Sequence, residues 1–233
     1  MIDILDKYGL MLLVGQFPEG PLGGLALTLL LAIGGLMAAF PLAVLMGVAR
    51  TSPIRAVRAP AALITNAVRG LPVLMLIFWA YFIVPLIVGR SVSGITTVIC
   101  ALVVYELAFL GEVIRAGIEA IPKGQIEAAR SLGMSYGQTM RKIVLPQALM
   151  QMTPSILSQF INLIKNTSLG YIISVNELTY AAYQVNAQLL TRPFEVYLIL
   201  ALTYFLLCWL LGQGVNKLEK SINQRRLAVP RSA

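Results

Sequence analysis

The chain has 233 residues, of which 58% are hydrophobic and 12% charged, and its mean hydropathy is +0.81. A soluble domain carries about 25% charged residues, so this composition argues against a soluble enzyme, a disordered protein and a secreted disulfide scaffold. It favours a polytopic α-helical membrane protein of one domain. Histidine is absent, and Cys100 and Cys208 both lie in apolar runs. We therefore expect no metal site and no disulfide.

Five apolar runs predict the membrane spans. A helix of about 20 residues crosses the roughly 30 Å of a bilayer core, and the alternation that a barrel strand needs is absent. Two of the runs reach this length only by including one ionisable residue, Glu106 or Lys165. The predicted helices lie near residues 22–48, 64–88, 93–115, 149–174 and 196–216.

The positions of lysine and arginine predict the orientation of the chain. The net charge is +8, but the basic residues are spread between the apolar runs, which is not typical of a nucleic-acid-binding surface. They gather after the first, third and fifth runs, whereas the other two connections carry only Arg90 and Arg192. The positive-inside rule then predicts an N-terminus outside and a C-terminus in the cytoplasm, with residues 217–233 as a basic cytoplasmic tail.

Residues 1–20 precede the first span and form a predicted extracytoplasmic segment. Ile2, Leu5, Tyr8 and Leu12 recur at helical spacing, which predicts an amphipathic helix on the outer membrane surface. A frayed tail is the alternative, because so short a helix is marginal alone. Early acidic residues and the lack of a small-residue cleavage site argue against a signal peptide. The predicted transmembrane domain is then residues 20–216.

The connection between the third and fourth spans, residues 119–146, is too long and too patterned to be a passive loop. Pro122 interrupts the third helix. The stretch Gln125–Leu132 predicts a short helix, which Gly133 can end in the left-handed conformation.

A second short helix is predicted to follow in the same connection. Ser135 and Gln138 have the spacing of a capping box that begins a helix. Pro146 is expected either to end this helix or to kink it into the fourth span. The whole connection is therefore predicted to be a helix–turn–helix that protrudes into the cytoplasm.

The first of these short helices has the features of a contact surface. Ala128 and Ala129 are small enough for a partner to approach the backbone closely, and Glu127 supplies one charge that a basic groove can pair. We interpret the connection as a knob that fits a socket on another protein. The alternative is a solvated elbow with ordinary capping.

Several motifs resemble those of one protein family. The ABC importer permeases have an EAA loop, and the spacing of seven residues resembles it: Glu127, Ala128, Ala129, Gly133, Ile143, Leu145 and Pro146. Four further segments resemble the polar amino acid permeases of the histidine, glutamine and glutamate group: Arg69–Pro72, Glu112–Ile118, Ile121–Gln125 and Lys165–Leu169.

The resemblance implies an all-α protein with the five-span type I ABC importer permease fold, in a bacterial cytoplasmic (inner) membrane. It implies three partners: an ABC ATPase dimer that holds ATP and Mg²⁺, a second permease that is homologous or identical, and an extracytoplasmic amino acid-binding protein. The EAA positions would couple the permease to the ATPase. The chain itself has no glycine-rich phosphate loop, so we expect it to hold no cofactor and not to be an enzyme.

Two ionisable groups at membrane depth are candidates for the translocation path or its gate. Glu106 in the third span either lines the path or is a structural residue within the bundle. Lys165 lies with Asn162, Asn166 and Ser168 in a polar stretch of the fourth span, which should face protein or water. Lys165 can neutralise Glu106, meet a substrate carboxylate, or order the interface between two permeases.

A structural ion ladder is predicted at the cytoplasmic end of the third span. Glu112, Arg115 and Glu119 are spaced at i+3 and i+4, so their side chains share one helix face.

Two functions compete. The leading hypothesis is the permease subunit of an ATP-driven, binding-protein-dependent importer of polar amino acids. Residues 78–85 and 105–109 resemble permeases for glutamate and aspartate, which implies a second, different permease. The alternative is an ion- or proton-coupled carrier or channel that uses Glu106 and Lys165, although no inverted repeat, common in such carriers, is visible.

Overall fold

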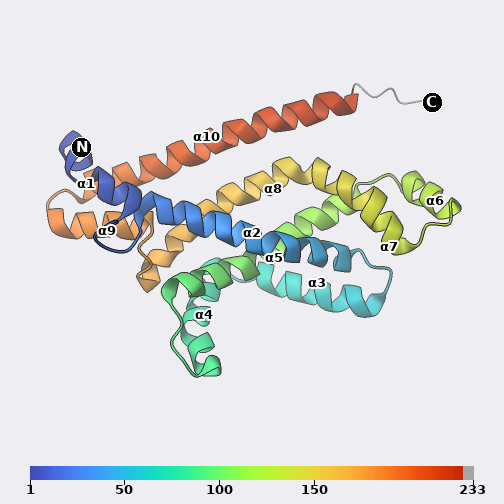
Figure 1. Ribbon diagram of the computed structural model, residues 1–233, viewed down its shortest axis with the longest axis horizontal. Coiled ribbons are helices and arrows are strands. Elements are labelled where there is room, and N and C mark those ends of the chain that lie inside the picture. Colours follow the sequence, from blue (N-terminus) through green and yellow to red (C-terminus); the bar gives the residue numbers. More distant parts are fainter. Residues whose placement is uncertain (228–233) are drawn as a thin grey trace. The chain divides into compact units, whose positions relative to one another are not determined.

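The computed structural model describes residues 1–227, and within them the secondary structure is helical apart from two isolated β-bridges (Figure 1). The last residues of the predicted basic tail, 228–233, lie outside the described residues. The helices are α1 Ile2–Val14, α2 Gly24–Arg50, α3 Arg55–Arg69, α4 Val73–Val88, α5 Gly94–Glu119, α6 Lys123–Ser131, α7 Tyr136–Thr139, η1 Met140–Val144, α8 Leu145–Thr167, η2 Ser168–Ile173, α9 Leu178–Leu189 and α10 Pro193–Leu227.

Three helices in the described part of the chain are long and apolar enough to cross a membrane: α2, α5 and α10. They correspond to the first, third and fifth predicted spans. The prediction of one continuous helix over 64–88 is wrong, because α3 ends at Arg69 and α4 begins at Val73, and the two form at most one bent span. Pro72 lies at the break and disfavours a helical conformation in the residue before it.

Helix α8 covers most of the predicted fourth span, but it is not among the helices that are apolar enough to cross a membrane by composition. Polar side chains along it, among them Gln151, Gln159 and Asn162, lower its hydropathy. The α-helix also ends at Thr167, where the 3₁₀ turn η2 begins, instead of at the predicted residue 174. α10, by contrast, continues well past its predicted end at residue 216.

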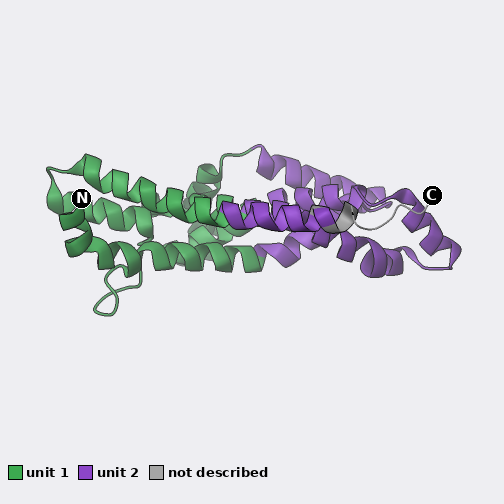
Figure 2. Cartoon of the chain, turned by 90° about the horizontal axis from the view of Figure 1, so that it is seen from above, with its two compact units in different colours: residues 1–38, 71–105, 160–211 green, residues 39–70, 106–159, 212–233 purple. Residues whose placement is uncertain are grey.

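The contacts divide the chain into two compact units, which Figure 2 shows in different colours. Unit 1 comprises residues 1–38, 71–105 and 160–211, and unit 2 comprises residues 39–70, 106–159 and the chain from 212 onward. Four helices, α2, α5, α8 and α10, contribute residues to both units.

The core of unit 1 is an apolar cluster supplied by four helices. Leu31 on α2, Ile77 on α4, Leu102 on α5 and Leu163 on α8 are all almost fully buried. Within a bilayer the lipid is as apolar as these side chains, so close packing rather than the hydrophobic effect holds such helices together.

A second apolar cluster of unit 1 joins α1 to α9 and α10. Ile4, Tyr8 and Leu12 are four residues apart on one face of α1 and are buried against these two helices. A helix is therefore present in this segment, and Tyr8 and Leu12 pack on the protein; its location on the outer membrane surface stays a prediction. Ile2 and Leu5 remain exposed.

In unit 2, α2 and α5 approach each other at glycine positions. A Cβ atom on Gly47 would lie 2.7 Å from Cγ2 of Ile114 and 3.0 Å from the carbonyl oxygen of Gly111. Both distances are shorter than van der Waals contact, so this approach requires a residue without a side chain at position 47.

We predict that Gly47→Ala destabilises the protein by about 1–3 kcal/mol, because the added methyl group must displace Ile114 or the α5 backbone. Thermal unfolding of the purified protein in detergent measures this. Gly34→Ala on the same helix is the control, since a Cβ atom there meets nothing within 4 Å. Equal melting temperatures for the two variants would contradict the prediction.

Candidate functional site

The elbow, which we define as residues 120–144, begins where α5 ends and contains α6, α7 and η1 (Figure 1). α6 ends in a Schellman turn, in which the Gly133 N–H donates to the Arg130 carbonyl at 2.9 Å and the Met134 N–H donates to the Ala129 carbonyl at 3.1 Å. Gly133 has φ +77°, a left-handed conformation that glycine adopts without strain. The turn thus fixes the direction in which the chain leaves α6.

The second part of the elbow starts with a capping box. Ser135 Oγ accepts a hydrogen bond from the Gln138 N–H at 3.4 Å, and Gln138 Oε1 accepts one from the Ser135 N–H at 2.9 Å. The helix that begins here does not end at Pro146, because α7 passes through the π-helical turn η1 into α8 without a break. Pro146 has no N–H to bond within the helix, and the wider π turn directly precedes it.

One glutamine at the start of α8 connects that helix to α6 of the elbow. Nε2 of Gln147 on α8 donates to Oε1 of Gln125 on α6 at 2.7 Å and to the carbonyl oxygen of Ile143 at 2.8 Å. The sequence analysis singled out neither glutamine, because partners 22 residues apart leave no local pattern.

The residues of the EAA pattern lie in different environments. Glu127 and Ala128 are exposed on α6, whereas Ala129 is 2% exposed and packs inside the elbow. Ala128 is therefore accessible to a partner in this structure and Ala129 is not, and the coupling role of both alanines stays a prediction. Leu132 is 84% exposed at the end of α6 and adds an apolar side chain to the accessible surface. The remaining positions of the pattern are half-buried (Ile143, Leu145) or exposed (Pro146).

Near the end of α5, one carboxylate gathers three arginines, a cluster that we call the Glu112 node. Arg115 donates to Glu112 Oε1 through Nε at 2.9 Å and Nη2 at 2.6 Å, and it also pairs with Glu119. Arg50 pairs with Glu112 Oε2, and Arg69 lies 3.8 Å from the same oxygen. The two contacts of the predicted ladder are present, and α2 and α3 add one arginine each.

Glu106 is fully buried on α5 within unit 2. The Gln159 side chain on α8 is a polar neighbour of its carboxylate. Neither carboxylate oxygen accepts a well-formed hydrogen bond. A buried acidic group with so little polar support is costly at membrane depth, so Glu106 is a candidate for a role beyond packing.

Lys165 lies in unit 1, at an open groove of about 370 Å³ whose other residues come from α10. Tyr204, Phe205, Cys208 and Trp209 line this groove beside it. Because Glu106 belongs to unit 2, the predicted pairing of Glu106 with Lys165 stays a prediction. Of the other predicted path residues, Asn162 is exposed, and Asn166 and Ser168 are half-buried.

The structure adds a buried acidic residue that the sequence analysis did not consider. Glu177 is fully buried and caps α9, accepting hydrogen bonds from the backbone N–H groups of Thr179 at 2.9 Å and Tyr180 at 3.0 Å, and from the Tyr204 hydroxyl at 3.1 Å. Burial raises the pKa of Glu177 to about 7, although these hydrogen bonds favour the charged form. The available signal was an acidic residue at the start of a helical stretch, where the helix dipole favours negative charge.

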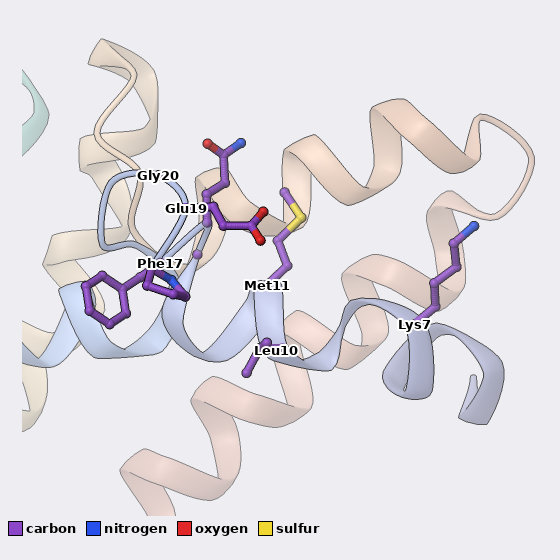
Figure 3. A pocket seen from close by; sticks show the side chains of 9 residues that line it. Lys7, Leu10, Met11, Phe17, Glu19 and Gly20 are labelled. Atoms are coloured by element: carbon purple, nitrogen blue, oxygen red, sulfur yellow. The ribbon is translucent and has the colours of Figure 1, made fainter.

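A pocket of about 560 Å³ lies beside α1 and the loop that follows it (Figure 3). Lys7, Leu10 and Met11 come from α1, and Phe17 and Glu19 come from the loop. Its lining mixes apolar groups with both signs of charge and points to no single class of ligand.

Comparison with known proteins shows the family. The profile of the binding-protein-dependent transport system inner membrane components matches residues 39–224. The chain belongs to this family. It is similar to the probable glutamine ABC transporter permease GlnP of Bacillus subtilis (strain 168), with 38% identity over 198 residues that cover 84% of this chain and 90% of that protein. The chain is thus a permease subunit of an ABC importer for amino acids.

Other relatives differ in the substrate for which they are named. The glutamate transport system permease GluD of Corynebacterium glutamicum is 35% identical over 210 residues, covering 88% of this chain and 76% of that protein. The crystal structure of an amino acid ABC transporter with histidines matches with a TM-score of 0.77 and 29% identity, covering 85% of this chain and 92% of that chain. Further relatives are named for cystine and arginine.

We predict that Glu177 makes the stability of the protein depend on pH. Its pKa is higher in the folded state than the ordinary value of 4.5, so the folded state binds the proton more tightly. The stability that results is fully present below about pH 4.5 and is lost as the pH rises through about 7. The melting temperature should fall over this range, and Glu177→Gln should remove that part of the fall.

Thermal unfolding in detergent between pH 5 and 8 measures this dependence. The control is Glu19→Gln, which changes an exposed carboxylate and should leave the pH profile of the wild type unchanged. Identical profiles for the wild type and Glu177→Gln would contradict the prediction.

Proposed function

We propose that the chain is the permease of a polar amino acid importer whose substrate is glutamate or aspartate. We also propose that its elbow couples it to a separate ATPase. One observation carries the coupling: α6 presents Glu127 and Ala128 to solvent on a helix held at both ends by a Schellman turn and by the Gln125–Gln147 bond. A helix restrained in this way moves as a rigid unit when a partner displaces it.

Each exposed feature of α6 has a matching role in this proposal. Ala128 permits close approach of a partner surface, Glu127 pairs with a basic group in it, and Leu132 fills an apolar depression. ATP and Mg²⁺ belong to the ATPase, and a second permease with its own elbow completes the complex. An extracytoplasmic binding protein delivers the amino acid.

The proposed topology has five spans, with the N-terminus outside and the C-terminus in the cytoplasm. α2, α5 and α10 are three of them, the bent pair α3 and α4 is a further span, and α8 is the fifth. The polar side chains of α8 then face protein or water rather than lipid. This places the elbow and the basic end of α10 in the cytoplasm.

Within this topology, Glu106 and Lys165 are the proposed path or gate residues. Both are ionisable groups at membrane depth, and polar amino acids carry an ammonium and at least one carboxylate that these side chains can recognise. Asn162, Asn166 and Ser168 extend the polar surface next to Lys165 on α8 and η2. The resemblance of residues 78–85 and 105–109 to glutamate and aspartate permeases favours an acidic substrate, and a relative named for glutamate supports it.

We predict that Glu127→Lys and Gly133→Val abolish uptake while membrane insertion survives. The first reverses the charge that α6 offers its partner. The second places a β-branched residue at φ +77°, which is strained and disturbs the Schellman turn by about 1–3 kcal/mol. Uptake and ATPase activity in proteoliposomes, with the amount of inserted protein, measure this.

The matched control is Gly137→Ala, in the same elbow, where a Cβ atom also meets nothing within 4 Å but φ is ordinary. It should transport like the wild type. Wild-type uptake by Glu127→Lys would show that the exposed charge is not used in coupling.

We also predict that uptake of radiolabelled glutamate or aspartate depends on the cognate binding protein and is blocked by vanadate, which inhibits ATP hydrolysis. Competition by unlabelled glutamine, arginine and cystine ranks the substrates. Uptake driven by a proton gradient alone, in the absence of ATP, would instead support a secondary carrier.

A further inference from the structure

The Glu112 node lies on the last turns of α5, just before the elbow along the chain. Glu119 is the last residue of α5, Arg115 pairs with both Glu119 and Glu112, and Glu112 reaches Arg50 and Arg69. All of these residues belong to unit 2. Because α5 runs directly into the elbow, displacement of the elbow carries Glu112 with it, and the contacts of Glu112 reach the last residues of α2 and α3.

We propose that Glu112 is a positioning residue for coupling: its carboxylate transmits displacement of the elbow to the ends of α2 and α3. This inference rests on the proposed function of the elbow. Its basis is that a single carboxylate is shared, Oε1 by Arg115 and Oε2 by both Arg50 and Arg69. When α5 moves, the two arginines on neighbouring helices must either follow or lose their partner.

The geometry makes the node stiff. Arg115 contacts Oε1 through two nitrogens, and charge-assisted bonds of this kind are short and directional. Arg50, Glu112 and Arg115 are only 12%, 21% and 25% exposed, so solvent screens their attraction less than at an open surface. The guanidinium of Arg69 also lies over the Phe109 ring on the same α5 face, 5.5 Å from its centroid.

The charge balance makes Glu112 the essential member of the node. Without its carboxylate, three guanidinium groups would lose their shared partner, and Glu119, which pairs with Arg115, is 55% exposed. Arg50 and Arg69 each end a helix, where a cation suits the helix dipole, and this interaction does not depend on Glu112. Removing Glu112 therefore cuts the connection between helices and leaves the helices themselves intact.

The test compares Glu112→Gln with Glu119→Gln in the full complex with its ATPase and binding protein, in proteoliposomes. The quantity measured is the number of substrate molecules taken up per ATP hydrolysed, together with basal ATPase activity and melting temperature. We expect Glu112→Gln to lower this ratio about tenfold, within the range of measured coupling free energies, with basal ATPase activity retained. Glu112→Asp should restore part of the ratio, and Glu119→Gln should stay within about twofold of the wild type.

Other results would overturn the proposal. A wild-type ratio in Glu112→Gln shows that the node is not used. A joint fall in basal ATPase activity, uptake and melting temperature shows a merely structural role. If Glu112→Gln does not assemble, the test uses Arg115→Lys, which keeps the charge but loses the two-nitrogen contact. A lowered ratio of uptake to ATP hydrolysis at normal melting temperature then supports the proposal, and an unchanged ratio overturns it. Failure of the proposed function is distinguishable, because the wild-type complex would then show no ATP-dependent uptake.

Discussion

Backbone N–H and carbonyl groups at the ends of helices need partners, and a break between helices has a fixed shape where the protein itself supplies them. In this chain the breaks have specific solutions. A Schellman turn at Gly133 closes α6, a capping box at Ser135 opens α7, and the Gln147 side chain donates to a carbonyl within the π turn η1. Glu177 caps α9 from a buried position. Because the breaks are closed, the elbow is a defined shape rather than a loose loop.

Three glutamates illustrate how surroundings determine the role of one side chain. Glu112 is surrounded by three arginines and holds helix ends together. Glu177 accepts two backbone N–H groups and a tyrosine hydroxyl and orders the start of α9. Glu106, with the Gln159 amide as its polar neighbour, has the weakest support of the three, which is why it is the candidate for contact with substrate or water.

The role proposed for the elbow follows from membership of the permease family. In the proposed function, a separate ATPase supplies the motion, and the permease needs a contact surface that is small, accessible and held firmly. Glu127, Ala128 and Leu132 provide the accessible part, and the Gln125–Gln147 bond provides one of the restraints. The Glu112 node then offers a route by which that motion reaches the helices.

The sequence by itself determined the all-helical membrane class, three of the spans, the capping box and the left-handed conformation of Gly133, because apolar length and capping depend on neighbours along the chain. It also determined the family, through the spacing of the EAA pattern. Tertiary structure decided what depends on partners far away in sequence: the burial of Ala129, the convergence of Arg50 and Arg69 on Glu112, the Gln125–Gln147 bond and the burial of Glu177. Pro72 indicates in the sequence that the second span can bend, but only the tertiary structure showed that the helix stops at Arg69 and starts again at Val73.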